Sequence, residues 1–559
     1  MNSKANQNHS ENRSAVLLNT FQIGKHRHRV FYNNGLLIWE KEKSKYGKTC
    51  IPIEDLISIS VQKQRHESPS YQTFPVLDAT SPSLNNDVTT ADFNHKSFTI
   101  NYARRLIEPK SAGAGSSSDV NKWRVHSISL FNNDPMIVRE WFETLSRVLN
   151  GNAPLSRPRK LLLFVNPYGG KKNALKLYEK YAKPIFCLAN IDVSVVITQR
   201  PNQIFDLVLQ QHLDHFDGIA CCGGDGTFSE LFNGLIYRDM VKNRSADEPA
   251  KIDVNNIPKP GKPLGVIPAG STDTIAYCLH GTTDIKTCII HIVLGQTTGL
   301  DLSSVSNDKG IIKFYASVMS YGYLGDLLYE SEKLRWLGPR RYEIAGFKKI
   351  LRNRGYDVEL QILQDPDTNI CSEVITNCDA KDKIKCFENC SVCLNVDGGG
   401  KPSSEEKFKR VSGKYFMVNG ANISCACSRS PAGMSPYAHN GDGYIDVILV
   451  KHGSLWNNLK LLLTLSSASG EIEQLPYVEL YRTRKFHIKA LNGTSRVSLN
   501  DSTQPISIPS SDGSSFWNCD GEILQETDVT VRSHRQLITV FRRGAAQESS
   551  KISGGCCLP

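Results

Sequence analysis

The chain has 559 residues, of which 40% are hydrophobic, 22% charged and 8% aromatic. This composition is typical of a globular protein and excludes a disordered or collagen-like chain. At roughly 100–200 residues per domain, the length predicts three to five domains, or fewer large ones. Lys and Arg number 66 and Asp and Glu 56, so the formal net charge is +10. We therefore expect an acidic partner, which could be nucleic acid, an anionic membrane or a phosphorylated substrate.

The sequence predicts neither a membrane-spanning helix nor a signal peptide. No apolar run approaches the about 18 residues of a span, and the polar start, MNSKANQNHSENRS, lacks an apolar signal core. We therefore predict a cytoplasmic protein that binds membranes only peripherally. The Golgi and plasma membranes are the expected sites. In such a chain the 16 cysteines indicate free thiols or a metal site rather than a disulfide framework.

Residues 15–150 predict several strands followed by one helix. Short apolar runs alternate with Lys-rich and Asn-Asn-Gly turns, a hairpin pattern, and the last segment places Trp141 on an apolar helical face. This order resembles a pleckstrin-homology (PH) domain, so we expect a β-barrel with a C-terminal helix. The resemblance implies phosphoinositide or anionic-membrane binding by Lys25, Arg27 and Arg29 in the first hairpin. The alternative is a solvated charged turn.

After a linker rich in Pro and Gly, the pattern changes to alternating strands and helices. Residues 157–296 predict a Rossmann-like parallel sheet flanked by helices. Residues 297–544 are dominated by strands and predict a mostly antiparallel β-sandwich lobe, with a polar, Cys-rich insert near 365–410. We expect residues 1–14 to be a disordered tail and residues 545–559 a flexible one.

Three glycine-rich segments end strands of the predicted parallel sheet. They read NPYGGKKN at 166–173, CGGDGTFSE at 222–230 and IPAGSTDTIA at 267–276. Ligands of parallel sheets bind beyond the carboxyl ends of the strands, and glycine lets backbone N–H groups approach a phosphate. Three such turns in one lobe predict phosphate binding, and none has the P-loop pattern GxxxxGK[ST].

An acid lies within the second glycine-rich segment. Asp225 would repel a phosphate, so its position indicates either a magnesium ion nearby or a base that takes the proton of a substrate hydroxyl. The alternative is that Asp225 caps the helix that starts at Thr227. Because Thr227 could itself be the cap, we favour a catalytic role.

The motifs GGDGT and NPYGGKK resemble the diacylglycerol-kinase catalytic superfamily, which also holds sphingosine and ceramide kinases. The third motif, PAGSTD, resembles the ceramide kinases, and the segments at 321–349, 441–450 and 519–544 agree, as does the spacing in CFENCSVC. The resemblance covers about residues 157–544 and the PH-like N-terminus. It implies a lipid kinase that transfers the γ-phosphate of ATP, with Mg²⁺, to the primary hydroxyl of ceramide. It also makes calcium a candidate regulator.

The resemblance further implies the site residues. Asp225 is the expected general base. The residues expected at the lipid substrate are Gly223, Gly224, Asp225, Gly226 and Asp326. Those expected at ATP are Asn166, Pro167, Tyr168, Gly169, Gly170, Thr198, Glu230, Gly270, Ser271, Thr272, Arg335, Arg341, Asp520, Gly521 and Glu522.

Two other segments carry chemistry. Residues 331–352 hold seven basic and two acidic side chains interleaved with apolar ones, a mixture that suits either ATP phosphates or a membrane surface. Cys386, Cys390 and Cys393 could bind zinc with a fourth ligand from Cys378, Cys425, Cys427 or a histidine, or could remain structural or redox thiols.

The leading interpretation is a ceramide kinase-like enzyme that forms ceramide 1-phosphate. The alternatives are a sphingosine or diacylglycerol kinase, and a non-catalytic lipid-binding scaffold with a kinase-like fold. The intact glycines and Asp225 argue against the scaffold. Nucleic acid is not an expected partner, because no standard nucleic-acid-binding motif is present.

Overall fold

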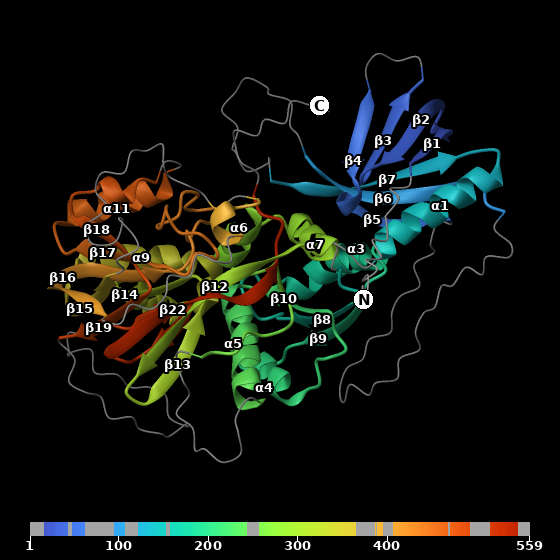
Figure 1. Ribbon diagram of the computed structural model, residues 1–559. Coiled ribbons are helices and arrows are strands. Elements are labelled where there is room, and N and C mark those ends of the chain that lie inside the picture. Colours follow the sequence, from blue (N-terminus) through green and yellow to red (C-terminus); the bar gives the residue numbers. More distant parts are fainter. Residues whose placement is uncertain are drawn as a thin grey trace, which may run out of the picture.

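Most of the chain is described by a computed structural model (Figure 1). The described residues are 16–42, 47–61, 94–106, 121–151, 157–242, 256–364, 386, 388–394, 406–467, 470–491 and 515–545. They form one sheet at the N-terminus and a second sheet that runs through the rest of the chain. The predicted tails, apart from Ala545, and most of the Cys-rich insert lie outside the described residues.

The N-terminal sheet has seven antiparallel strands in the order β4-β3-β2-β1-β7-β6-β5. The predicted closed barrel is wrong for the described strands, because β4 and β5 form the two ends of an open sheet. A single helical turn, Ile53–Asp55, separates these two strands. The elements are β1 (Leu17–Ile23), β2 (His26–Asn33), β3 (Leu36–Lys41), β4 (Lys48–Pro52), β5 (Leu56–Ser60), β6 (Ser97–Arg105), β7 (Trp123–Phe131) and α1 (Pro135–Asn150).

Helix α1 packs its apolar face on this sheet, as the sequence predicts. Asp134 caps the helix by accepting a hydrogen bond from the backbone N–H of Met136 at 2.9 Å, and Pro135 follows at the first helical position, where proline is tolerated. Trp141 is fully buried. Its ring stands edge-on to Phe21 at 5.3 Å between centroids, so one aromatic side chain anchors the helix.

The second sheet begins with parallel strands in the order β9-β8-β10-β11. Alternate residues of β8 face opposite sides: Leu162 packs with α4, α5 and α6, and Leu163 packs with α2, α3 and α7. The predicted alternation of strands and helices is confirmed. The elements are β8 (Lys160–Val165), α2 (Ala174–Leu177), the π-turn η4 (Tyr178–Ala182), α3 (Lys183–Leu188), β9 (Asp192–Ile197), α4 (Gln203–Gln210), β10 (Gly218–Gly223), α5 (Asp225–Lys242), β11 (Leu264–Pro268), α6 (Thr274–His280) and α7 (Ile285–Leu294).

The same sheet continues as antiparallel strands. The last strand, β22, pairs with β12 along most of its length and in parallel with β11 at Leu264 and Val540, so hydrogen bonding joins the two halves. Its elements are β12 (Thr297–Asn307), β13 (Gly310–Tyr315), β14 (Val318–Gly322), α8 (Tyr323–Glu332), η5 (Arg335–Arg340), α9 (Arg341–Arg352), β15 (Tyr356–Gln364), α10 (Ser391–Leu394), β16 (Lys407–Ala421), β17 (Ile445–Lys451), α11 (Leu455–Ser466), η6 (Ile472–Gln474), β18 (Val478–Thr483), β19 (Lys485–Ala490), β20 (Trp517–Cys519), β21 (Glu522–Leu524) and β22 (Asp528–Phe541).

The strand-rich composition predicted for residues 297–544 is confirmed in their described part. Strand β22 forms hydrogen bonds with strands of both halves of the sheet. The sheet is therefore continuous across the domain boundary predicted at residue 297. Among the described helices, none is long and apolar enough to cross a membrane.

The N-terminal sheet packs against α7 and the C-terminal end of β22 (Figure 1). The backbone N–H of Trp123 donates to the Thr287 hydroxyl at 2.9 Å, and Arg124 holds Asp284, the cap of α7, by two hydrogen bonds of 2.6 and 3.2 Å. Apolar packing and charged contacts thus attach the N-terminal sheet to the second sheet and its helices.

A buried arginine forms the centre of this interface. The guanidinium of Arg543 pairs with Asp55, with Glu54 at 3.2 Å and with Glu388 at 3.3 Å, and it lies 4.6 Å from the ring centre of Trp123. These partners come from three separate parts of the chain, so Arg543 joins the N-terminal sheet, the Cys-rich insert and β22.

Candidate active site

Three glycine-rich turns meet at the carboxyl ends of β8, β10 and β11. Gly170 has a φ of +53°, a conformation that favours glycine. A Cβ added to Gly170 would lie 2.6 Å from the carbonyl carbon of Gly270, and one added to Gly270 would lie 2.6 Å from the Cα of Gly224. No side chain fits between these backbones. The turns therefore contact one another directly, which lets a phosphate approach backbone N–H groups and the start of α5.

Asp225 is the first residue of α5 and points its carboxylate into the protein. One carboxylate oxygen accepts the backbone N–H of Thr274 at 3.0 Å and the other that of Ile275 at 2.9 Å. Asp225 therefore caps α6. The capping role considered from the sequence was for a different helix, the one that starts near Thr227. Burial raises the pKa of Asp225 to about 6 in spite of these hydrogen bonds, and the Asp520 carboxylate adds to the rise.

Asp273, in the turn before α6, was not singled out from the sequence. It has a φ of +53°, and its carboxylate accepts the backbone N–H of Gly270 at 2.8 Å. Burial and repulsion by the Asp225 carboxylate raise the pKa of Asp273 to about 7, while the Lys171 ammonium lowers it. Its position could have been noticed because PAGSTD ends in an acid directly before a predicted helix.

Asp520 reaches the same place from the C-terminal segment. Its carboxylate accepts the backbone N–H groups of Ala316 at 2.7 Å and Ser317 at 2.9 Å, so it holds the turn between β13 and β14. Its backbone oxygen lies 3.9 Å from the position that a Cβ on Gly226 would occupy. The backbone of this segment therefore approaches the second glycine turn, and its role at ATP stays a prediction.

The first glycine turn is tied to the second through Asn166. The side-chain amide of Asn166 donates to the Thr227 hydroxyl at 3.0 Å and accepts the backbone N–H of Tyr168 at 3.0 Å. The Tyr168 ring is exposed, and Pro167 and Gly169 share its turn. Ser271 and Thr272 lie in the third turn, between β11 and α6.

The side chains of Thr198 and Glu230, both expected at the nucleotide, form hydrogen bonds with the protein backbone. Thr198 follows β9 and is buried, with its hydroxyl 3.4 Å from the carbonyl oxygen of Val165. The Glu230 carboxylate accepts the backbone N–H groups of Ile204 at 2.7 Å and Phe205 at 3.4 Å. It therefore caps α4, and burial raises its pKa.

Asp326, the residue expected at the lipid head group, lies in a separate polar pocket. It is buried in α8 and accepts hydrogen bonds from Lys349 at 3.1 Å, Tyr356 at 2.6 Å and Ser515 at 2.6 Å. A cavity of about 30 Å³ adjoins it. None of these hydrogen-bond partners belongs to a glycine turn, so the described contacts do not join Asp326 to Asp225.

The remaining residues expected at ATP differ in their surroundings. Arg341 pairs with Glu332 at 3.1 Å and donates to the Tyr342 hydroxyl at 2.7 Å, which ties α9 to α8. Glu522 pairs with Lys313, next to Gly521 in the turn between β20 and β21. The Arg335 side chain lies outside the described residues.

The basic residues of the first hairpin are where the sequence placed them. Lys25 lies in the turn between β1 and β2, and Arg27 and Arg29 follow on β2; all three are exposed. Arg27 lies 3.8 Å from Glu42. Phosphoinositide binding at this hairpin stays a prediction.

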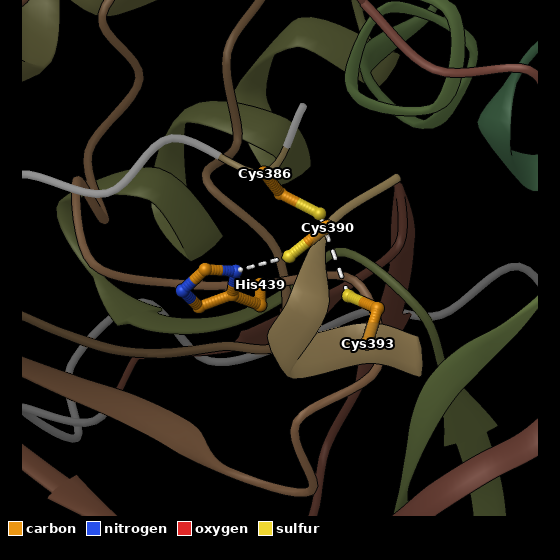
Figure 2. Close-up of side chains that lie close together, drawn as sticks. All are labelled: Cys386, Cys390, Cys393 and His439. Atoms are coloured by element: carbon orange, nitrogen blue, oxygen red, sulfur yellow. Dashed lines mark hydrogen bonds between the residues drawn. The ribbon is translucent and has the colours of Figure 1, made fainter. Parts of the chain in front are cut away.

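The three cysteines of the insert gather around a histidine (Figure 2). The Sγ atoms of Cys386 and Cys393 are 3.5 Å apart, and the Sγ of Cys390 lies 3.2 Å from Nδ1 of His439. The sequence left the fourth member open among three cysteines and an unnamed histidine. No spacing rule selects His439, because it lies on another segment of the chain.

Comparisons with known proteins found similar sequences and structures. Residues 160–305 match the diacylglycerol kinase catalytic domain, and residues 316–557 match the ceramide kinase C-terminal domain. The ceramide kinase of Mus musculus is 34% identical over 77% of this chain and 82% of its own length. That of Homo sapiens is 33% identical over 76% and 80%. A putative diacylglycerol kinase structure from Bacillus anthracis str. Sterne is 15% identical, with a TM-score of 0.44, over 70% of this chain and 97% of its own.

The class of protein follows from the first of these matches, since the three glycine turns and Asp225 all fall within a diacylglycerol kinase catalytic domain. With ceramide kinases one third identical over most of both chains, the chain belongs to the ceramide kinase family.

Proposed function

We propose that this protein transfers the γ-phosphate of ATP to the primary hydroxyl of ceramide, giving ceramide 1-phosphate and ADP. Family membership supports the reaction. The observation that carries the site is the direct contact of three glycine turns around one acid, Asp225. Phosphoryl transfer needs mainly positioning and charge neutralisation, and both can be supplied at the carboxyl ends of parallel strands.

The glycine turns bind the phosphates of ATP. Gly169, Gly170, Ser271 and Thr272 offer backbone N–H groups, and helix α5 adds the positive end of its dipole. Gly521 and its neighbours close the site from the C-terminal segment. Thr198 and Glu230 act indirectly, because their polar groups already hold β8 and α4.

Asp225 is the general base. As the ceramide oxygen bonds to the γ-phosphorus and the bond to the ADP oxygen breaks, the hydroxyl proton passes to the Asp225 carboxylate. A pKa of about 6 leaves this group ionised at neutral pH and still able to take a proton. Each carboxylate oxygen accepts one N–H from α6 and so keeps a lone pair free for the substrate.

The family uses ATP with a divalent metal, and we take the metal to be Mg²⁺. The donors fit, because the Asp225 carboxylate raises the pKa of Asp273 and the Asp520 carboxylate raises that of Asp225. No ion pair among the described residues neutralises Asp225. Asp273 would hold the ion together with ATP oxygens, since Mg²⁺ is bound through one or two carboxylates plus phosphates. When bound, the ion neutralises phosphate charge.

The α8–α9 segment is proposed to face the membrane that holds ceramide. Trp336 is 80% exposed and Phe347 is 62% exposed, and both lie among lysines and arginines of residues 331–352. Exposed Trp456 and Leu463 on α11 extend the apolar area, and α11 packs beside α9. Aromatic side chains among basic ones suit an interface with anionic lipid.

The N-terminal sheet with α1 is proposed to act as a PH-like module. The strand order, the buried Trp141 and the exposed hairpin support this assignment. The protein would then work at the cytoplasmic face of the Golgi or plasma membrane, bound by Lys25, Arg27 and Arg29. A response of the activity to calcium is also proposed, on the ceramide kinase resemblance alone.

A substrate panel tests the reaction. The full chain is incubated with radiolabelled ATP and Mg²⁺ and with ceramide, sphingosine or diacylglycerol in the same mixed micelles. We expect ceramide 1-phosphate as the main product. If the enzyme prefers sphingosine or diacylglycerol, that lipid replaces ceramide as the proposed substrate. If none of the three lipids is phosphorylated, the result supports the non-catalytic scaffold. Repeating the assay with added calcium tests the regulator.

A further inference from the structure

The three cysteines and one histidine of Figure 2 form a compact group of ligand atoms. Cys386, Cys390 and Cys393 each offer one sulfur and His439 one nitrogen, and all four atoms lie within 4.8 Å of one another. Among the described residues, no other group of three or more such side chains gathers this closely. The four belong to no part of the proposed catalytic site.

The distances suit a tetrahedral metal ion. With Zn–S bonds of about 2.3 Å and Zn–N bonds of about 2.0–2.1 Å, neighbouring ligand atoms stand about 3.4–3.8 Å apart. The Cys386–Cys393 and Cys390–His439 separations of 3.5 and 3.2 Å are close to this range. A disulfide needs about 2.05 Å, and all three cysteines are free.

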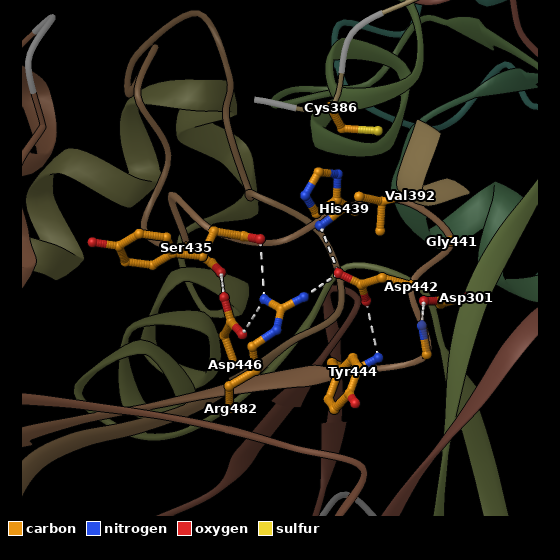
Figure 3. A network of polar contacts seen from close by, with 12 residues as sticks. Asp301, Cys386, Val392, Ser435, His439, Gly441, Asp442, Tyr444, Asp446 and Arg482 are labelled. Carbon is orange, nitrogen blue, oxygen red and sulfur yellow. Dashed lines mark hydrogen bonds and ion pairs between the residues drawn. The ribbon is translucent and has the colours of Figure 1, made fainter. Parts of the chain in front are cut away.

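His439 is also held in place by residues other than the cysteines (Figure 3). Its backbone N–H donates to the Asp442 carboxylate at 3.2 Å. Asp442 pairs with Arg482, which also donates to the Tyr437 carbonyl and to Asp446, both at 3.0 Å. The network fixes the loop before β17, so the histidine is positioned before any metal arrives.

Strand β22 holds the cysteine segment from the other side. Arg542 donates to the Sγ of Cys386 at 3.2 Å and to its carbonyl oxygen at 3.0 Å, and Gln536 donates to the carbonyl oxygen of Cys393 at 2.7 Å. A cation beside the sulfur stabilises a thiolate, and hydrogen bonds from outside the ligand set orient metal ligands. Both features are expected of a metal site and are unnecessary for inert thiols.

We propose that Cys386, Cys390, Cys393 and His439 bind one structural Zn²⁺ ion. Three thiolates and one imidazole make a closed tetrahedral set, which is typical of structural zinc and leaves no position for a substrate. Soft sulfur ligands in this geometry favour zinc over magnesium or calcium. The inference is independent of the reaction assigned to the glycine turns.

The bound ion orders a segment that reaches the N-terminal sheet. Glu388 lies between the first two cysteine ligands and pairs with Arg105 at 2.6 Å and with Arg543 at 3.3 Å. The zinc site therefore fixes the acid that two arginines of the interface share. Without the ion, the three cysteines of this short segment lose their common anchor.

The first experiment measures metal content. Full chain with its affinity tag removed is dialysed against a weak chelator and analysed by inductively coupled plasma mass spectrometry. We expect one zinc per chain. Less than about 0.1 zinc per chain, another metal in its place, or a Cys386–Cys393 disulfide in the non-reduced protein overturns the proposal.

The second experiment identifies the ligands. Cys390→Ser and His439→Ala are expected to lose at least nine tenths of the zinc, whereas Cys187→Ser, a matched change in α3 far from the group, keeps it. Wild-type levels of zinc in either ligand variant overturn the assignment. Circular dichroism of each variant shows whether it has folded.

A third measurement on wild-type protein avoids variants that fail to fold. After zinc is removed with a strong chelator, one equivalent of Co²⁺ should produce the visible absorption of tetrahedral cobalt bound to thiolates, and Zn²⁺ should abolish it. Three more thiols per chain should become reactive on removal of zinc. Absence of the cobalt absorption in protein that regains its fold contradicts the site.

A fourth measurement tests the link to the interface. Glu388→Gln is expected to retain zinc and to be digested several-fold faster by trypsin, and zinc removal from wild-type protein should give the same acceleration. If zinc removal leaves the cleavage rate unchanged, the ion does not support the interface.

Discussion

The glycine-turn site and the interface of the N-terminal sheet each contain a buried aspartate carboxylate, Asp225 in the first and Asp55 in the second. Burial raises the pKa of Asp225 and of Asp55 to about 6. Asp55 has a cation beside it, because Arg543 pairs with it and offsets part of the cost of burial. No ion pair neutralises Asp225 among the described residues, and its partners are the two backbone N–H groups of α6.

With Asp225 as the proposed base, the difference separates a structural carboxylate from a reactive one. In the interface both charges of the pair are supplied by the chain, so the contact is complete when the protein folds. At the glycine turns the chain supplies an acid and backbone dipoles and leaves the cation to arrive with the substrate. Similar pKa values therefore accompany different roles, and the surroundings of each carboxylate distinguish them.

The largest expected effect is at Asp225. Asp225→Asn should lower turnover of ceramide by about 10²–10⁴-fold, because the amide cannot take the hydroxyl proton, while ATP binding is retained. The measurement is initial rate together with nucleotide affinity. Asp217→Asn is the matched control, since Asp217 accepts two backbone N–H groups at the opposite end of β10. A rate for Asp225→Asn within a few-fold of wild type would contradict its role as base.

The second effect is at the interface. Arg543→Ala should destabilise the protein by about 3–5 kcal/mol, because it leaves the buried Asp55 without its cation. Denaturant unfolding followed by tryptophan fluorescence measures this. Arg200→Ala breaks the exposed pair with Asp206 and should cost no more than about 1 kcal/mol. Equal effects of the two substitutions would show that the Arg543 pairs are not special to the interface.

The third effect concerns the exposed hairpin. Replacing Lys25, Arg27 and Arg29 together by Gln should weaken binding to anionic vesicles by about 10- to 100-fold, since each such charge contributes about 1 kcal/mol near the surface. Turnover in detergent micelles should not change. A triple replacement of exposed Lys407, Arg410 and Lys414 on β16 is the control of equal charge. Equal loss of vesicle binding in the two triple variants would indicate that net charge, rather than a site on the hairpin, determines binding.

The smallest effect is on pH dependence, where the two aspartates act in opposite directions. The kcat/KM should fall about tenfold per pH unit below pH 6 as Asp225 is protonated. The stability that Asp55 contributes is complete below about pH 4 and is lost as pH rises through about 6, because its pKa is raised on folding. Asp55→Asn should flatten the stability curve between these values and leave the acid limb of the rate profile in place. A shifted acid limb in Asp55→Asn would contradict the separation of the two roles.

Contiguous motifs made the glycine turns predictable. Alternating apolar runs located the strands, and the glycines located the turns that follow them, where we propose that phosphate binds. Trp141 likewise marked α1. These features depend on the periodicity of strands and helices and on the conformational freedom of glycine, which are properties of a few neighbouring residues.

Side-chain partners were not predictable in the same way. Asp225 caps α6, Glu230 caps α4 and Asp520 holds the β13–β14 turn; in each case the partner lies on another segment. The prediction of a closed barrel was wrong. Closure requires β4 to pair with β5 at the two ends of the sheet, and no local sequence pattern encodes that pairing.

The sequence alone determined the family, the parallel sheet and the glycine turns at its carboxyl edge, because local patterns and short motifs carry that information. Only the tertiary structure decided that Arg543 joins Asp55 to Glu388 and that His439 lies beside the three cysteines. The physical reason is distance along the chain: these contacts join residues that come together only when the N-terminal sheet, the insert, the loop before β17 and the segment after β22 pack against one another.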